Sequence, residues 1–317
     1  MTVTKKEVVD GVTVYTVEKN MDDTKAHDLG NRFVNSSMID FIIRDHDADV
    51  FTTEGKLLLR FRKNALTKTH TRDFYDNVIE FAESPTSNRG STSGSKSKNV
   101  YDNPKIMSNI IGYFDRFPPN YKVSFKRAGI KPPLEIRECR FNRDHPEQFK
   151  KMIPLIQEIN ALYAESTPDH FKEQNAKAKQ TFFKIPGTAF TTVTTNVNFK
   201  TSIHKDKGDD ADGFGNLAVI ESGKYEGAET CFPQFGIGVD VRTGDMLFMD
   251  VHEWHGNLPM KPIDKDAKRL SIVCYLRYKI WLRTKNKTRK FFEKHNRTIR
   301  NFTKPGSATK SGGYIQL

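Results

Sequence analysis

The pattern of apolar and polar positions divides the chain into a helical middle and a β-rich second half. Residues 144–164 follow the helical period most clearly, with apolar side chains at Phe149, Ile153, Ile156 and Tyr163. Asp144 suits the N-cap of this helix and Pro146 suits its first turn. A second, polar helix is predicted over 168–180.

From residue 181 the pattern changes to short runs rich in Val, Thr and Phe with turns between them. These runs are 188–203, 216–220, 228–232, 236–242, 245–250 and 269–277. Short strands at such spacing are typical of an antiparallel sandwich or barrel. Earlier in the chain, residues 51–66 predict a hairpin that turns at Glu54-Gly55. The Ser/Gly-rich segment 84–99 predicts a flexible surface loop or linker.

Length and composition limit the class of protein. The chain has 317 residues, enough for two average domains or one large β-rich domain, and its 36% apolar content excludes a wholly disordered chain. No run approaches the roughly 18 apolar residues of a membrane span, and the N-terminus lacks the apolar region of a secretory signal. We therefore expect an intracellular, soluble protein that contacts no membrane.

Three cysteines, Cys139, Cys231 and Cys274, are widely spaced in the chain. An odd number with no CxxC pair argues against a disulfide scaffold and against a cysteine-based zinc site. Cys231 and Cys274 fall in strand-like runs and are expected to be small buried hydrophobic residues.

The positive charge of the chain is concentrated near its C-terminus. The net charge is +12, and residues 277–317 hold twelve Lys and Arg against a single acid, Glu293. Aromatic residues are interleaved with these cations, a combination that suits phosphate contacts and base stacking. The candidate nucleic-acid contacts are Lys285, Lys287, Arg289 and Lys290. The alternative is a solvated helix and tail whose charge only aids solubility.

One group of residues has the composition of a metal site. His204 and Asp206 follow the Thr-rich run, and positions i and i+2 of an extended chain point to the same side. A second histidine, either His252 or His255, lies in GDMLFMDVHEWHGN. Two histidines and one carboxylate that leave coordination positions open form the facial triad of non-haem Fe(II) oxygenases.

Further polar residues could line a pocket beside this group. Arg269 opens the next strand as Arg269-Leu270-Ser271, and its planar fork matches a carboxylate, to which the hydroxyl can add a bond. Asp209 could face a bound base but is better explained as a turn aspartate in DKGDDADG. Asn196 could line the pocket or pair across strands.

The order of these residues resembles that of the 2-oxoglutarate and Fe(II)-dependent dioxygenases, and most closely the TET/JBP group, which oxidises the 5-methyl of pyrimidines in DNA. The similarity to base J-binding-protein-like thymine hydroxylases covers about 135–277, including FTTVTTNVNFKTSIHKDKGD and MDVHEWHGN. The resemblance implies an α+β protein with a double-stranded β-helix (jelly-roll, cupin-like) core and flanking helices.

The resemblance also implies roles for individual residues. His204, Asp206 and His255 would hold the iron, and His255 is preferred to His252 because the family's ligand follows its Gly-Asp turn by about ten residues. Arg269 would form a salt bridge with 2-oxoglutarate, assisted by Ser271. The implied cofactors are Fe(II), 2-oxoglutarate as cosubstrate, and O2.

The implied organisation has an N-terminal α/β extension over 1–134, a dioxygenase core over 135–283 and a basic tail over 284–317. The implied function is hydroxylation of the 5-methyl group of thymine or 5-methylcytosine, with DNA as partner. Two alternatives stay open: a protein side-chain hydroxylase of the same fold, and a non-catalytic nucleic-acid-binding jelly-roll protein.

Overall fold

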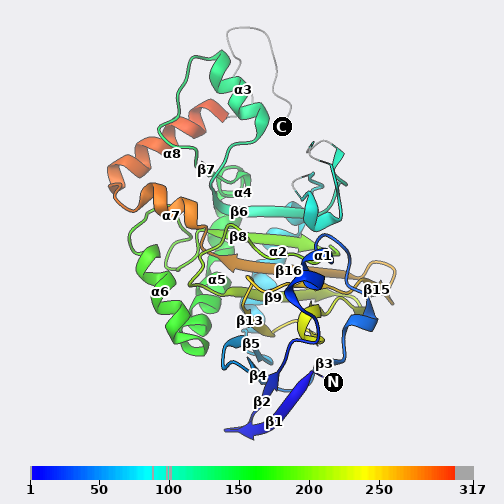
Figure 1. The fold of residues 1–317 in the computed structure, drawn as a ribbon. Coiled ribbons are helices and arrows are strands. Elements are labelled where there is room, and N and C mark those ends of the chain that lie inside the picture. Colours follow the sequence, from blue (N-terminus) through cyan, green and yellow to red (C-terminus); the bar gives the residue numbers. More distant parts are fainter. Residues whose placement is uncertain (1, 88, 98, 100–101, 304–317) are drawn as a thin grey trace.

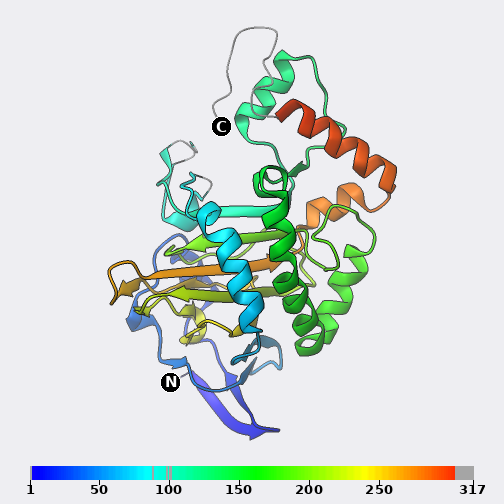
Figure 2. The ribbon, with the colours of Figure 1, turned by 180° about the vertical axis from the view of Figure 1, so that it is seen from behind.

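The computed structural model describes residues 2–87, 89–97, 99 and 102–303. A large sheet crosses the molecule, with helices against one face and a smaller sheet against the other (Figures 1 and 2). Apolar clusters fill both interfaces, one between the large sheet and the helices and one between the two sheets. Among the described residues, no helix has both the length and the apolar character that crossing a membrane requires.

The strand order of the sheets joins distant parts of the chain. The ten-stranded sheet runs β1 (Val3–Val9), β2 (Val12–Val17), β4 (Ala48–Thr52), β5 (Leu57–Arg62), β13 (Met246–Met249), β9 (Gly215–Ser222), β16 (Lys268–Tyr275), β8 (Thr192–Val197), β6 (Ser108–Phe114), β7 (Arg137–Glu138). The four-stranded sheet runs β14 (Gly256–Asn257), β11 (Thr230–Phe232), β12 (Ile237–Val239), β3 (Phe41–Ile43). A separate pair joins β10 (Tyr225–Gly227) and β15 (Met260–Pro262).

The helices lie mainly on one face of the large sheet and at its end. They are α1 (Asp23–Asp28), α2 (Lys68–Ala82), α3 (Pro119–Arg127), α4 (Arg140–Asp144), α5 (Pro146–Ser166), α6 (Pro168–Ala178), α7 (Tyr278–Thr284) and α8 (Arg289–Thr303). Figure 2 shows α2 and α5 crossing the face of the sheet. Both helices bury one apolar stripe there, as their helical period requires.

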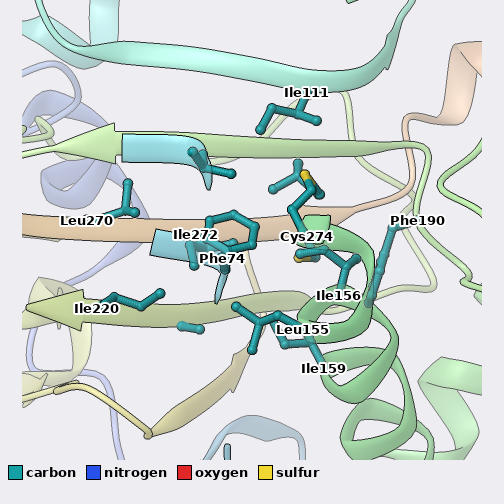
Figure 3. Packing of buried hydrophobic residues seen from close by; sticks show 14 of the residues in the cluster. Phe74, Ile111, Leu155, Ile156, Ile159, Phe190, Ile220, Leu270, Ile272 and Cys274 are labelled. Carbon is teal, nitrogen blue, oxygen red and sulfur yellow. The ribbon is translucent and has the colours of Figure 1, made fainter. Parts of the chain in front are cut away.

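The alternation of side chains along β16 decides which residues face the helices. Leu270, Ile272 and Cys274 belong to the apolar cluster beneath α2 and α5 (Figure 3). Successive strand residues point to opposite faces, so Arg269 and Ser271 point to the other side of the sheet. The predicted burial of Cys231 and Cys274 is confirmed, and burial raises the pKa of both thiols.

The predicted helix over 144–164 is present, but its predicted cap is wrong. Asp144 is the last residue of α4, where its carboxylate pairs with Arg143 at 2.6 Å. The N-cap of α5 is His145, which makes no side-chain cap hydrogen bond. The cause is Pro146, because a proline disfavours helical geometry in the residue before it and so separates α4 from α5 at His145.

The N-terminal third is joined to the large sheet. The predicted hairpin over 51–66 is confirmed as antiparallel β4 and β5, and β5 pairs with β13. Strand β6 pairs with β8 at the other side of the sheet. The boundary at residue 134 stays a prediction, but hydrogen bonds of the sheet run across it.

The C-terminal basic segment is largely helical where the structure describes it. Helix α8 buries His295 and Ile299 against the region of α3 and β7, which Figure 1 shows at one end of the molecule. Part of its charge is used inside the fold, since Arg283 donates to backbone carbonyls and Arg300 pairs with Glu138. The alternative interpretation of 277–317, a solvated helix and tail whose charge only aids solubility, therefore does not hold for Arg283 and Arg300, and 304–317 lie outside the described residues.

The core beneath α2 gives a stability prediction. Phe74 is fully buried in the cluster between the sheet, α2 and α5. Phe74→Ala is expected to lower the free energy of unfolding by about 3–5 kcal/mol because it leaves a cavity there. Phe182→Ala is the matched control, since Phe182 is 45% exposed, and should cost about 1 kcal/mol or less. Urea unfolding measures both values, and an equal loss of unfolding free energy in the two variants would contradict this packing.

Candidate metal centre and its pocket

The backbone brings two histidines together from distant segments. His204 lies in the loop after β8, and His255 directly precedes β14. Their backbones form an antiparallel bridge, in which the amide of each donates to the carbonyl of the other at 2.8 and 2.9 Å. The two imidazole rings therefore lie side by side, with centroids 4.4 Å apart.

Hydrogen bonds to carbonyls orient both rings. Nδ1 of His204 lies 2.7 Å from the carbonyl of Ser202, and Nδ1 of His255 lies 2.9 Å from that of Glu253. A ring that donates from Nδ1 carries its lone pair on Nε2, the atom that would bind a metal. Asp206 completes the group, because its two oxygens lie 3.6 Å and 3.9 Å from the Nε2 atoms of His204 and His255.

The geometry and protonation of this group suit a metal ion. One ligand atom from each of His204, Asp206 and His255 lies within 4.8 Å of the others. Burial, followed by the neighbouring His255, lowers the pKa of His204 to about 4, although Asp206 acts in the opposite direction. A neutral imidazole is the form that binds metals. Two nitrogens and one carboxylate suit a divalent transition metal such as Fe(II) and leave positions for other ligands.

His252 has a different environment. Its two ring nitrogens lie 3.1 and 3.2 Å from the carbonyls of Asp206 and Asp210. The ring thus bridges two points of the loop that carries the carboxylate, and both of its nitrogens face backbone oxygens. The geometry favours His255 over His252 as the third ligand.

A cavity of about 130 Å³ joins this group to Arg269 and Ser271, which line it. Water occupies about 30 Å³ per molecule in the liquid, so the cavity can hold a small organic molecule. Arg269 is 7% exposed and its Nε has no hydrogen-bond partner among the described residues, while Tyr225 and the Asp240 carboxylate partly offset its burial. Burial lowers its pKa. A buried cation without a close ion-pair partner is suited to an anionic ligand.

A chain of polar side chains holds Ser271 in place. Asn196 donates to its hydroxyl at 3.2 Å, and Ser108 of β6 donates to Asn196 at 2.6 Å. Arg89 donates in turn to Ser108 at 2.9 Å and to Thr194 at 3.2 Å. Asn196 therefore has both of the roles expected as alternatives from the sequence: it lines the cavity, and it pairs with Ser271 across two strands.

The opposite end of the cavity is formed by Asp209, Tyr275 and Arg277. Burial and the nearby Asp206 carboxylate raise the pKa of Asp209, against the effect of Arg277. Nη2 of Arg277 lies 2.9 Å from Asp115, while Nη1 lies 3.9 Å from Asp209. The interpretation of Asp209 as an ordinary turn aspartate is wrong, because its backbone forms an antiparallel bridge with Arg277 and its side chain lines the cavity.

Sequence reasoning missed Arg89, Thr194, Tyr275 and Arg277 as cavity residues. For β16 the signal was present, since counting by two from Arg269 along an extended chain gives 271, 273, 275 and 277, all of which line the cavity. Arg89 had no such signal, because it lies in a Ser/Gly-rich segment without periodicity. The flexibility predicted for 84–99 stays a prediction, but Arg89 and Thr92 of this segment reach the cavity.

The four predicted nucleic-acid contacts lie elsewhere, between the end of α7 and the start of α8. Lys285 stands over the ring of Trp281 at 4.8 Å, and Lys287 stands over Phe291 at 5.3 Å. Arg289 pairs with Glu293 at 3.2 Å, and Lys290 is exposed. None of the four lines the cavity.

The sequence was compared with protein families and curated proteins. Residues 123–278 match the Tet_JBP family model, described as the oxygenase domain of the 2OGFeDO superfamily. The chain is 32% identical over 241 residues to thymine dioxygenase JBP1 of Trypanosoma brucei brucei, covering 75% of this chain and 26% of that protein. It is 31% identical over 204 residues to the bifunctional helicase and thymine dioxygenase JBP2 of Trypanosoma cruzi, covering 63% and 17%.

These matches extend the predicted resemblance, which covered only about 135–277. The chain spans about a quarter or less of the length of these relatives. Among solved structures, NgTET1 in complex with 5mC DNA superposes with a TM-score of 0.50 at 13% identity, covering 88% of this chain and 100% of that chain. The predicted double-stranded β-helix core with flanking helices is confirmed.

The assignment of the third metal ligand can be tested with two matched variants. His255→Ala is expected to weaken Co(II) binding, followed by its visible absorption, by more than about 100-fold, because it removes a ligand. His252→Ala is expected to weaken binding by about tenfold or less, because it changes only the support of the ligand loop. Retained binding in His255→Ala together with its loss in His252→Ala would reverse the assignment.

Proposed function

Residues 123–278 belong to the Tet/JBP oxygenase family of the 2OGFeDO superfamily, and on this premise we propose that the chain hydroxylates the 5-methyl group of a pyrimidine in DNA. Thymine, converted to 5-hydroxymethyluracil, is the preferred substrate, because the similar curated proteins are named thymine dioxygenases. The corresponding product from 5-methylcytosine is 5-hydroxymethylcytosine. The proposed cofactors are Fe(II), 2-oxoglutarate and O2.

A single observation carries the proposal. One cavity is lined both by the group of His204, Asp206 and His255 and by the buried Arg269, whose Nε has no hydrogen-bond partner among the described residues. The first set has the donor atoms that Fe(II) takes in oxygenases of this kind. The second can neutralise a carboxylate of a keto-diacid bound beside the metal.

The proposed reaction combines the chemistry of the cofactors with the binding groups of the protein chain. Fe(II), 2-oxoglutarate and O2 would supply the oxidation: the keto acid would give CO2 and succinate, which takes one oxygen atom, and the other oxygen atom would enter a C–H bond of the methyl group. The chain supplies binding and orientation. Arg269 binds the distal carboxylate, and Ser271, held by Asn196, donates a further hydrogen bond.

The walls of the cavity also limit water. Leu217, Met249 and Val273 contribute apolar surface to it, so a bound cosubstrate would be shielded beside the metal group. A base stacked inside a duplex cannot bring its methyl group to a metal group that lies within a cavity. The substrate is therefore a nucleotide turned out of the helix or a base in single-stranded DNA.

We also propose a contact to DNA phosphates along α8. Lys290, Lys294 and Arg297 follow each other at spacings of four and three residues, so they share one face, and all three are exposed. The opposite face carries the buried His295 and Ile299. A row of exposed cations supports phosphate binding and counterion release.

The hydroxylation is tested by nucleoside mass spectrometry of DNA incubated with the protein, Fe(II), 2-oxoglutarate and ascorbate. The wild type is expected to form 5-hydroxymethyluracil, and His204→Ala to form none at any cosubstrate concentration. Arg269→Gln should raise the KM for 2-oxoglutarate by about 100-fold, so that high cosubstrate restores product. Succinate formation without a modified base would reject the DNA substrate and favour hydroxylation of a protein side chain.

The α8 contact is tested through the salt dependence of DNA affinity. Replacing Lys290, Lys294 and Arg297 by Gln should reduce the slope of log K against log salt by about 0.9 for each phosphate that the variant no longer neutralises. The control replaces Lys68, Lys151 and Lys265, three exposed lysines away from α8, and removes the same charge. Equal slopes for the two triple variants would remove α8 from the interface.

A further inference from the structure

Arg277 lines the cavity with one end of its guanidinium, which makes only a long ion pair with Asp209 and keeps a hydrogen bond to offer. Its Nε and Nη2 lie 3.1 Å and 2.9 Å from Oδ1 of Asp115. Its Nη1 makes no hydrogen bond to a described residue, and the nearest carboxylate oxygen, on Asp209, is 3.9 Å away. Nη1 therefore remains able to donate a hydrogen bond to a ligand in the cavity.

The neighbours of Arg277 hold the guanidinium in one place. Asp115 is 3% exposed, and the guanidinium lies 4.7 Å from the ring centroid of Phe114. The Cα of Gly208 lies so close that a Cβ added there would stand 2.4 Å from Nη1. The direction of the free donor is therefore set by the protein, which is the condition for selective recognition.

The two candidate bases differ at the position next to the reactive methyl group. Thymine carries a carbonyl oxygen at position 4, which only accepts hydrogen bonds, and cytosine carries an amino group there, which donates them. Arginine is a pure donor. It can bond to the thymine oxygen, whereas it would meet the cytosine amino group donor to donor.

We propose that Arg277 reads the group at position 4 of the pyrimidine and thereby selects thymine over 5-methylcytosine. The inference rests on the proposed function, which places the methyl group at the metal and so brings position 4 into the same cavity. Asp115 acts as a positioning residue that fixes the orientation of the guanidinium. The preference for thymine then has a source in this chain's own residues, independent of the names of its relatives.

Asp209 is the other residue able to recognise the group at position 4 of the base. In its carboxylate form Asp209 accepts hydrogen bonds and would favour the amino group of cytosine, whereas the raised pKa of this carboxyl favours the protonated form, which also donates. Its side chain also lines the cavity, but it faces the cationic Arg277 across 3.9 Å. This opposition makes the two residues separable, because their substitution should change the base preference in opposite directions.

The test uses two single-stranded oligonucleotides that are identical except for one central thymine or 5-methylcytosine. Their affinities are measured by fluorescence anisotropy without Fe(II) or 2-oxoglutarate, and their product yields by mass spectrometry with both. The wild type should favour thymine in both measurements. Arg277→Gln, which can both donate and accept, should reduce this preference about tenfold or more.

Two further variants distinguish the loss of the contact between Arg277 and the base from a loss of folding. The double variant D115N/R277Q removes both charges of the buried pair, and it should lose the preference while keeping the unfolding temperature close to that of the wild type. Arg277→Lys remains a pure donor and should still favour thymine. A preference for 5-methylcytosine in Arg277→Lys would contradict the proposal.

Other outcomes separate this inference from the proposed function. Equal weakening of both oligonucleotides by Arg277→Gln, or a loss of thymine preference in Asp209→Asn alone, would overturn the role of Arg277. A wild type that hydroxylates both bases equally would do the same and leave the proposed function intact. Tighter binding of thymine without any hydroxymethyl product would reject the proposed function and support the reading by Arg277.

Discussion

The register of β16 between β8 and β9 is the constraint on which the rest of the structure depends. Ser271 pairs with Asn196 on one side and with Val219 on the other. In this register Leu270, Ile272 and Cys274 enter the core beneath α2 and α5, and the alternate residues enter the cavity. A slip of one residue would place Arg269 in the apolar core. The hydrophobic packing of one face thus positions the polar groups of the other.

The two cavity arginines, Arg269 on β16 and Arg277 just after it, are buried in different ways. Arg277 is neutralised by Asp115, so its burial costs little unless one partner is removed. Arg269 has no comparably close partner: burial lowers its pKa, and Tyr225 and Asp240 oppose this effect only in part. Such a group reduces the stability of the empty protein, and an anionic ligand would remove that cost. The same logic applies to Asp206, whose two oxygens face two imidazole nitrogens with room for a cation between them.

The sequence was sufficient for parts of the fold that depend on local pattern. The apolar stripe of α5, the hairpin of β4 and β5, and the strand-like runs after residue 181 were predicted because periodicity is a local property. The prediction of an N-cap at Asp144 was wrong because Pro146 fixes the start of α5, so that His145 is the N-cap although Asp144 is a good capping residue. The position of Asp209 failed because a turn motif does not reveal what its side chain meets. The position of Arg89 at the cavity could not be predicted from the sequence, because its partners Ser108 and Thr194 are distant along the chain.

The cavity is completed by residues from before position 134. Arg89 and Ser108 support the side chains that hold Ser271, and Asp115 orients Arg277 at the other end. Strand β6, which carries Ser108, pairs with β8, so this support belongs to the sheet itself. The metal group and Arg269 alone would account for cosubstrate chemistry, but the two ends of the cavity take their shape from the N-terminal third. Selectivity for a substrate therefore depends on residues outside the segment that carries the metal ligands.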